Sequence, residues 1–116
     1  MTNLGGVLFD MDGVLLDTEP LYTVAYDRLM APHGARLDRD TKLEIMGRPA
    51  ILSAAHVIQK FALPMTPEEF LEMRKPILAE LFAHSPAMPG AEDFVRALSN
   101  RVYRLAVATS THRALF

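Results

Sequence analysis

Two short apolar segments, one near each end of the chain, constrain the fold most. Val7-Leu8-Phe9 lies between a glycine pair and Asp10, and a second apolar run extends from Tyr103 to Ala108. Short apolar runs bounded by turn residues are typical of buried strands. The long segment between them has helical spacing, so we expect two parallel strands joined by a largely helical connection.

Turn and capping residues divide that connection into five expected helices. Thr18 is a candidate N-cap, and Thr66-Pro67-Glu68-Glu69 combines a cap, a proline at the first helical position and a capping box. Gly47-Arg48-Pro49 breaks the chain and leaves Arg48 on a loop. Pro76 is expected to kink its helix. The helices are expected at residues 19 to about 32 or 34, 38–46, 50–62, 67 to about 83 and 91–100.

Two of these helices carry a predicted buried face. In the fourth, we expect an apolar stripe along one face of the helix, and in the fifth we expect apolar side chains that point inward. The stripe consists of Phe70, Met73, Ile77 and Leu81, and the inward side chains are Phe94, Val95 and Leu98. Residues His112 to Phe116 are expected to begin a further helix.

The predicted fold class is α/β, with a sheet domain of two parallel strands and an inserted α-helical bundle. We place the sheet domain at residues 1–16 and 87–116, and the helical domain at 17–86. The helical block can bury a shared apolar interior. Two parallel strands cannot do the same, because parallel sheets are normally covered on both faces and need at least three strands for stability. The sheet domain is therefore expected to be incomplete, with an edge open to self-association.

Composition narrows the classes of partner. The chain has 116 residues, of which 50% are hydrophobic and 22% charged, and its formal net charge is −2. With the charges interspersed, there is no basic stripe for nucleic acid and no polybasic membrane anchor, so a small ligand is expected. The absence of cysteine excludes disulfides and thiol chemistry. Residues 1–9 resemble neither a signal peptide nor a membrane span, which favours a cytoplasmic location.

Polar clusters follow both expected strands. Asp10-Met11-Asp12-Gly13 follows the first, and Thr109-Ser110-Thr111 follows the second. Ligands of open parallel sheets bind at the carboxyl ends of the strands, so the two clusters are expected to converge. A spacing of two places the Asp10 and Asp12 side chains on one side of the chain, while Met11 points away.

Paired carboxylates in this arrangement suit phosphoryl transfer. Asp10 is placed to attack phosphorus and form an aspartyl-phosphate, and Asp12 to protonate the leaving group and then deprotonate the hydrolytic water. A carboxylate and a phosphate repel each other, so a cation is required, and Mg²⁺ held by Asp10 and Asp12 is the natural choice. Gly13 allows a tight turn that brings backbone N–H groups toward the phosphate. Thr109 and Ser110 are candidate phosphate contacts.

Simpler interpretations of these motifs remain open at this point. Asp10 and Asp12 can also cap a turn, and Thr109-Ser110-Thr111 can also be a helix N-cap. A calcium-binding loop is excluded, because Val14, Leu15 and Leu21 occupy positions where such a loop needs Asp or Asn, Gly and Glu. The four histidines have no metal-ligand spacing and are assigned no role.

A longer stretch carries a resemblance to a known family. Val7 to Leu15, followed by Asp17-Thr18-Glu19, resembles the first motif of the haloacid dehalogenase superfamily. Thr109 resembles its second motif, and the helical insertion resembles its small α-helical cap. The segments Leu63-Pro64-Met65, Met88-Pro89-Gly90-Ala91 and Ala108-Thr109-Ser110 are similar to those of the pseudouridine-5′-phosphatase and glycerol-phosphate phosphatase group.

The resemblance implies a Rossmann-like core, a mobile cap, aspartyl-phosphate chemistry and Mg²⁺. It also implies a lysine and an acidic pair on later strands, and no lysine follows Lys75. The chain is therefore expected to correspond to the amino-terminal half of such a phosphatase. Glu19 and Arg48 are candidate substrate contacts from the cap, Arg48 because its loop resembles the cap loop that meets the active site. A solvated surface role for Arg48 remains equally open.

These expectations leave three functions to compare. The first is a phosphatase of small phosphorylated metabolites such as sugar, nucleoside or polyol phosphates. The second is a non-catalytic fragment that acts, if at all, by association. The third is a phosphosugar mutase of the same fold, which is disfavoured because such mutases usually carry a histidine where this chain has Pro20-Leu21-Tyr22. Whether the chain is itself an enzyme is left open.

Overall fold

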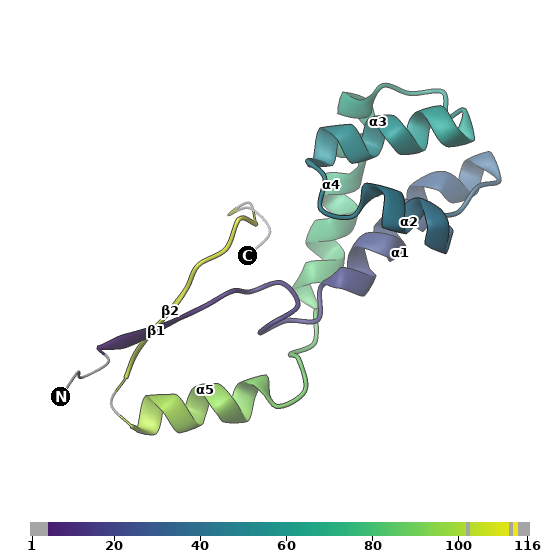
Figure 1. Ribbon diagram of the computed structural model, residues 1–116. Helices are drawn as coiled ribbons and strands as arrows, with labels where there is room; N and C mark the ends of the chain where they lie inside the picture. The colour runs from purple at the N-terminus through teal and green to yellow at the C-terminus, as the bar shows by residue number, and fades with distance from the viewer. Residues whose placement is uncertain (1–4, 102, 112, 114–116) are drawn as a thin grey trace. The chain divides into compact units, whose positions relative to one another are not determined.

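The computed structural model describes residues 5–101, 103–111 and 113. The described residues form a mixed α/β fold with two parallel strands, which confirms the predicted fold class (Figure 1). The helical turn predicted at His112 to Phe116 falls largely outside these residues. The elements are β1 (Gly6–Phe9), α1 (Glu19–Met30), the short 3-10 helix η1 (Ala31–His33), α2 (Arg39–Ile45), α3 (Ala50–Phe61), α4 (Pro67–Ala83), α5 (Ala91–Asn100) and β2 (Arg104–Val107).

The chain divides into two compact units. The first unit combines residues 1–20 with residues 82–116, and the second consists of residues 21–81. The first unit contains both strands and α5, while the second contains nearly all of the first four α-helices. A helical insertion between two strands therefore exists, whereas the domain limits predicted at residues 17 and 86 stay a prediction.

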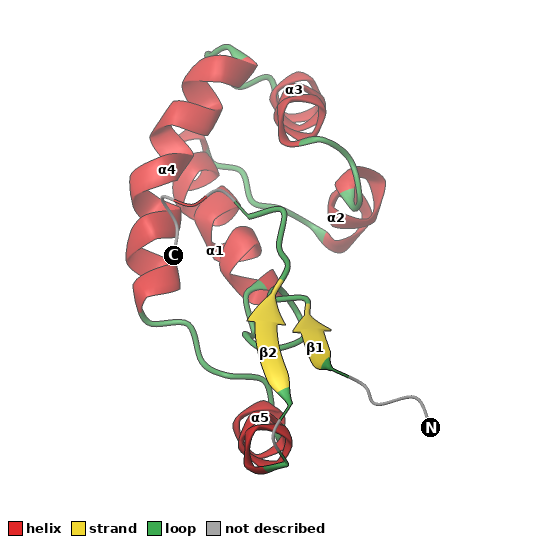
Figure 2. Cartoon of the chain, turned by 90° about the vertical axis from the view of Figure 1, so that its left-hand side faces the viewer, coloured by secondary structure: helices red, strands yellow, loops and turns green. Residues whose placement is uncertain are grey.

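The first unit is a strand–helix–strand arrangement. β1 and β2 run parallel, with Gly6 opposite Arg104 and Phe9 opposite Val107 (Figure 2). The ring of Phe9 meets the ring of Phe94 on α5 edge to face, with centroids 6.0 Å apart. Phe9 is thereby buried. One face of the sheet is therefore packed against α5.

The opposite face of the sheet is open. Side chains alternate along a strand, so Leu8 points away from Phe9 and is 74% exposed. Phe94 points inward to Phe9, as predicted, but its ring remains 57% exposed. A two-stranded sheet is too narrow to cover an aromatic ring completely. The described part of the sheet domain is thus incompletely covered on both faces.

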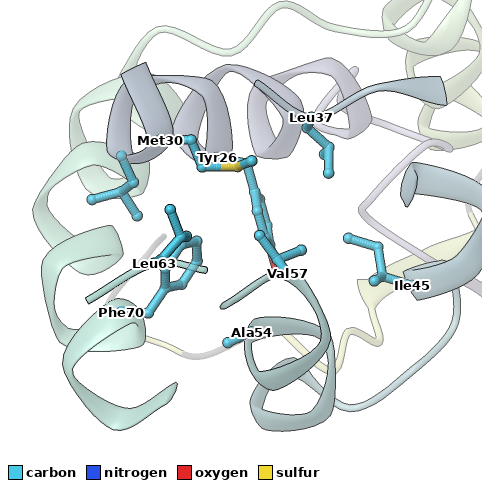
Figure 3. Packing of buried hydrophobic residues seen from close by; sticks show 9 residues of the cluster. Tyr26, Met30, Leu37, Ile45, Ala54, Val57, Leu63 and Phe70 are labelled. Carbon is cyan, nitrogen blue, oxygen red and sulfur yellow. The ribbon is translucent and has the colours of Figure 1, made fainter. Parts of the chain in front are cut away.

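The second unit has a well-packed apolar interior. Phe70 and Met30 are fully buried (Figure 3). The ring centroids of Phe70 and Tyr26 lie 5.1 Å apart. Burial of this many apolar side chains is the main source of stability for a small helical bundle. The cluster consists of Tyr26, Leu29, Met30, Leu37, Ile45, Ala54, Val57, Leu63 and Phe70.

The buried face of α4 differs from the predicted one. Leu78 is 2% exposed and Ile77 packs against the core, whereas Met73 is 48% exposed. Positions 70, 77 and 78 share one side of a helix with 3.6 residues per turn, and position 73 lies at the flank of that side. Met73 was therefore placed wrongly. Pro76 lies inside α4, which continues to Ala83.

Side-chain caps define two of the helix starts. Asp38 precedes α2 and accepts a hydrogen bond from the Thr41 N–H at 2.7 Å. Thr66 precedes α4, and its hydroxyl accepts a hydrogen bond from the Glu69 N–H at 3.1 Å, as predicted. Each cap satisfies a backbone donor that has no partner within the helix. Among the described residues, no helix is long and apolar enough to cross a bilayer.

Candidate active site

The loop after β1 folds back tightly on itself. The N–H groups of Leu15 and Leu16 both donate to the Met11 carbonyl at 3.0 Å, and the Gly13 N–H donates to the Leu16 carbonyl at 2.9 Å. Gly13 has a φ of +73°, a left-handed conformation that glycine adopts without strain. The predicted tight turn at Gly13 is confirmed, and it fixes the backbone directly after the two aspartates.

A second segment of the first unit anchors this loop. The Asp17 N–H donates to the Pro86 carbonyl at 2.9 Å, and the Met88 N–H donates to the Leu15 carbonyl at 2.8 Å. Leu16 and Ala87 thereby form an isolated antiparallel bridge. The chain segments that enter and leave the helical insertion are hydrogen-bonded side by side, so the site loop does not depend on β1 alone for its position.

Asp10 and Asp12 lie on the accessible side of the chain. Asp10 is exposed and Asp12 half-buried, whereas Met11 between them is 5% exposed. One oxygen of Asp10, Oδ1, accepts a hydrogen bond from the Met11 N–H at 2.8 Å. The alternation follows the predicted pattern. A carboxylate that is exposed and held by a backbone donor is suited to meet a substrate or a cation.

Two hydroxyl groups hold the carboxylate of Asp12. Thr18 Oγ1 donates to Asp12 Oδ1 at 2.7 Å, and Thr111 Oγ1 donates to Asp12 Oδ2. Thr18 is completely buried. Hydroxyl groups can both donate and accept, so either threonine can also accept a hydrogen bond from a protonated carboxyl. Asp12 is thus oriented by contacts that tolerate a change in its protonation state.

The end of β2 lies beside the end of β1, as predicted. The Ala108 N–H donates to the Phe9 carbonyl at 2.7 Å, which extends the strand pairing by one bond. Beyond it, the Thr109 hydroxyl accepts a hydrogen bond from the Thr111 N–H at 3.1 Å. Ser110 is exposed. The two polar clusters therefore converge, and the contact between them is made by Thr111.

The sequence did not single out the two threonines that bind Asp12. Thr18 was interpreted as an N-cap, and Thr111 as part of a hydroxyl-rich run. The signal that could have identified Thr111 is its spacing of two from Thr109, which places both side chains on one side of an extended chain. No local signal points from Thr18 to Asp12.

Glu19 and Arg48 lie in different units. Glu19 is exposed at the first position of α1 and belongs to the first unit. Arg48 is exposed in the second unit, on the loop between α2 and α3, where Gly47 has a φ of +75°. The predicted loop position of Arg48 is confirmed. A substrate contact for either residue stays a prediction.

The donor set near Asp10 fits Mg²⁺. Within the described ranges, no group of three or more acidic or histidine side chains gathers at a metal-binding distance. Mg²⁺ keeps several water ligands and is usually held by one or two carboxylates together with substrate phosphate oxygens. Asp10 and Asp12 provide two carboxylates at the accessible strand end, which meets that requirement.

A comparison with protein families decides the classification. The model of the haloacid dehalogenase-like hydrolase family matches residues 7–116. The chain belongs to this family. The match contains β1 from Val7 onward, the helical insertion, β2, Asp10 and Asp12, and it confirms the resemblance found in the sequence.

Individual relatives are phosphatases by name. The chain is 36% identical to (DL)-glycerol-3-phosphatase 1, mitochondrial, of Arabidopsis thaliana, over 95% of this chain and 38% of the plant protein. It is 38% identical to the phosphorylated carbohydrates phosphatase of Thermotoga maritima, over 90% of this chain and 49% of that protein. The chain thus spans less than half the length of these two relatives.

Solved structures share the fold. CbbY from Rhodobacter sphaeroides, crystallised in complex with phosphate, superimposes with a TM-score of 0.71 at 23% identity. The superposition covers 97% of this chain and 54% of CbbY. At this level of identity the likeness extends to the fold alone, and it supports the strand–insertion–strand arrangement.

Proposed function

We propose that the protein is a Mg²⁺-dependent phosphomonoester hydrolase that acts on small phosphorylated metabolites through an aspartyl-phosphate intermediate. One observation carries the proposal: an exposed carboxylate, Asp10, lies two residues from a second carboxylate, Asp12, whose two oxygens are held by hydroxyl groups. Because Asp10 is exposed and Asp12 is half-buried and hydrogen-bonded, Asp10 can act as the nucleophile and Asp12 as the proton donor and acceptor.

Asp10 is assigned the nucleophilic role. Its Oδ1 accepts the Met11 N–H, which orients the carboxylate, and the side chain is exposed. Attack of a carboxylate oxygen on phosphorus forms a P–O bond to Asp10 and breaks the bond to the leaving alkoxide. The acyl phosphate is then hydrolysed by attack of water at phosphorus, which restores the carboxylate.

Asp12 is assigned the proton transfers. In the first step the protonated carboxyl donates its proton to the leaving alkoxide, and in the second step the carboxylate accepts a proton from the attacking water. Thr18 and Thr111 each bind one oxygen of Asp12, and either hydroxyl can accept a hydrogen bond from the single O–H of the protonated carboxyl. The position of Asp12 can therefore stay fixed while its proton is lost and regained.

A magnesium ion held by Asp10 and Asp12 would neutralise the charge between the carboxylate and the phosphate. The Thr109 hydroxyl and the backbone N–H groups of the turn after β2 are proposed to bind phosphate oxygens, with Ser110 beside them. The family membership and the names of the relatives support a phosphate ester as substrate. Sugar, nucleoside and polyol phosphates are the proposed class.

The test is Mg²⁺-dependent release of phosphate from an aryl phosphate by the 116-residue chain. Asp10→Asn removes the nucleophile and is expected to abolish turnover, since amides do not attack phosphorus. Asp93→Asn, the same change on the exposed face of α5, is the matched control and is expected to keep full activity. Absence of turnover in the folded wild type would contradict the proposal and favour the non-catalytic alternative.

A further inference from the structure

Arg74 occupies an unusual environment in the helical unit. It lies on α4, and its guanidinium carbon is 5.8 Å from the ring centroid of Tyr22 and 6.0 Å from that of Tyr26. The two tyrosines are four residues apart on α1, so their rings lie on one face of that helix. One guanidinium therefore lies over two aromatic rings.

Arg74 is more shielded from water than the other arginines. It is half-buried, whereas every other arginine in the described part of the chain is exposed. Arg28 on α1 provides the contrast. It is exposed, and its guanidinium forms an ion pair with the carboxylate of Glu80 on α4, with N and O 3.7 Å apart. Among the described residues, no carboxylate lies within 4.0 Å of the Arg74 guanidinium.

The neighbouring tyrosines do not balance the charge of Arg74. Burial raises the pKa of Tyr26, although the charge of Arg74 and a hydrogen bond from it act in the opposite direction. The phenol therefore stays neutral near pH 7. A charge that is partly removed from water without an anionic partner carries a desolvation penalty, which an anion relieves.

The geometry leaves the guanidinium able to receive an anion. The N–H donors of a guanidinium lie along its edges, and its five donors are more than the hydrogen bond to Tyr26 engages. Phosphate and carboxylate groups match this edge with two parallel hydrogen bonds. The rings also restrict the rotation of the side chain, which reduces the entropy lost when an anion binds.

We propose that Arg74, together with Tyr22 and Tyr26, forms a binding site for the oxyanion of a small molecule, either a phosphate or a carboxylate. The site lies within the helical unit and contains none of the residues assigned to the hydrolytic site. The proposal goes beyond the proposed function, since anion binding is measured without turnover.

Tyrosine fluorescence reports directly on this site. The chain contains no tryptophan and three tyrosines, two of which contact Arg74. In a Tyr103→Phe background, emission comes from Tyr22 and Tyr26 alone. Inorganic phosphate and sodium acetate are titrated separately at constant ionic strength in EDTA, with sodium chloride as the reference salt. The two titrations distinguish a phosphate site from a carboxylate site.

The expected result is a saturable fluorescence change with phosphate or acetate that is absent with chloride. Arg74→Gln is expected to weaken binding at least tenfold, and Arg74→Lys to weaken it less, because an ammonium keeps the charge but not the forked donors. Arg28→Gln is the matched control and keeps the wild-type affinity. Asp10→Asn also keeps it, which separates this site from the hydrolytic one.

Three results would overturn the proposal. The first is a wild type that shows no saturable change with either anion. The second is an Arg74→Gln variant that binds as tightly as wild type. The third result is an Arg74→Lys variant with unchanged affinity, because the site requires the guanidinium fork. If circular dichroism shows that Arg74→Gln does not fold, the lysine variant decides.

Discussion

The Thr111 hydroxyl donates a hydrogen bond to the Asp12 carboxylate, although 99 residues separate them in the sequence. The contact joins the turn after β2 to the loop after β1. Thr18 Oγ1 donates a second hydrogen bond to the other oxygen of this carboxylate, Asp12 Oδ1. Asp12 therefore connects three chain segments of the first unit, and its position depends on all of them.

The buried hydroxyl of Thr18 is expected to stabilise the first unit. Thr18→Val keeps the shape of the side chain but removes the donor to Asp12, and a hydrogen bond to a charged group contributes about 1.5–3 kcal/mol. We expect the free energy of unfolding in urea to fall by about that amount. The same change at Thr23 is the matched control.

Thr23 differs from Thr18 in its hydrogen bonding. Among the described residues, its buried hydroxyl has no hydrogen-bond partner. Thr23→Val should therefore be neutral or stabilising, since it removes a polar group that is buried without compensation. Equal destabilisation by the two substitutions would contradict the role assigned to the bond between Thr18 and Asp12.

The core of the helical unit depends on Phe70. Because Phe70 is fully buried, Phe70→Ala is expected to cost about 3–5 kcal/mol in the free energy of unfolding. Met73→Ala, three residues further along α4, removes a side chain that is 48% exposed and should cost much less. Urea denaturation followed by circular dichroism measures both, and similar losses at the two positions would mean that Met73 is buried after all.

Asp38 makes the stability of α2 depend on pH. The N–H of Thr41 holds the pKa of Asp38 below its usual value. A carboxyl whose pKa is lowered by folding stabilises the protein above its unfolded pKa, near 4, and this contribution is lost as pH falls through the folded value. We expect Asp38→Ala to lower the urea midpoint at pH 7 and to have little effect near pH 2. An effect of Asp38→Ala that does not change with pH would refute this explanation.

The open edge of the sheet is proposed to promote self-association. Leu8 is 74% exposed on a strand whose outer edge has no neighbour among the described residues, and such edges pair readily with other chains. Sedimentation velocity is expected to show oligomers that dissociate on dilution. Leu8→Lys should shift the population to monomer, whereas Leu43→Lys, at another exposed leucine, should not. A wild type that stays monomeric at high concentration would exclude this association.

Much of the architecture could be predicted from local patterns. The helix at residues 91–100 has the predicted limits, and the break at Gly47-Arg48-Pro49 lies between two helices as expected. These features depend on residues close together in the sequence, such as the cap formed by Thr66 and Glu69. Fold class and family followed from the two strands and the motif at Asp10.

Long-range contacts could not be predicted in the same way. The contact between Thr111 and Asp12 depends on the pairing of β1 with β2, and the position of Arg74 over Tyr22 depends on how α4 packs against α1. His56 was assigned no role, yet its Nε2 lies 2.6 Å from Glu44 Oε2, where it helps to keep the pKa of Glu44 low. Each of these pairs brings together residues from different elements, so no local spacing reveals them.

The central claim is that Asp10 accepts a phosphoryl group and Asp12 activates the water that removes it. An aryl phosphate with a good leaving group needs no proton from Asp12 for the first step, so Asp12→Asn should form the intermediate but hydrolyse it slowly. Mass spectrometry of Asp12→Asn quenched in acid is therefore expected to find one hydroxylamine-sensitive phosphoryl group on the peptide that contains Asp10. Absence of that group, or its presence at another residue or in the Asp10→Asn variant, would contradict the account.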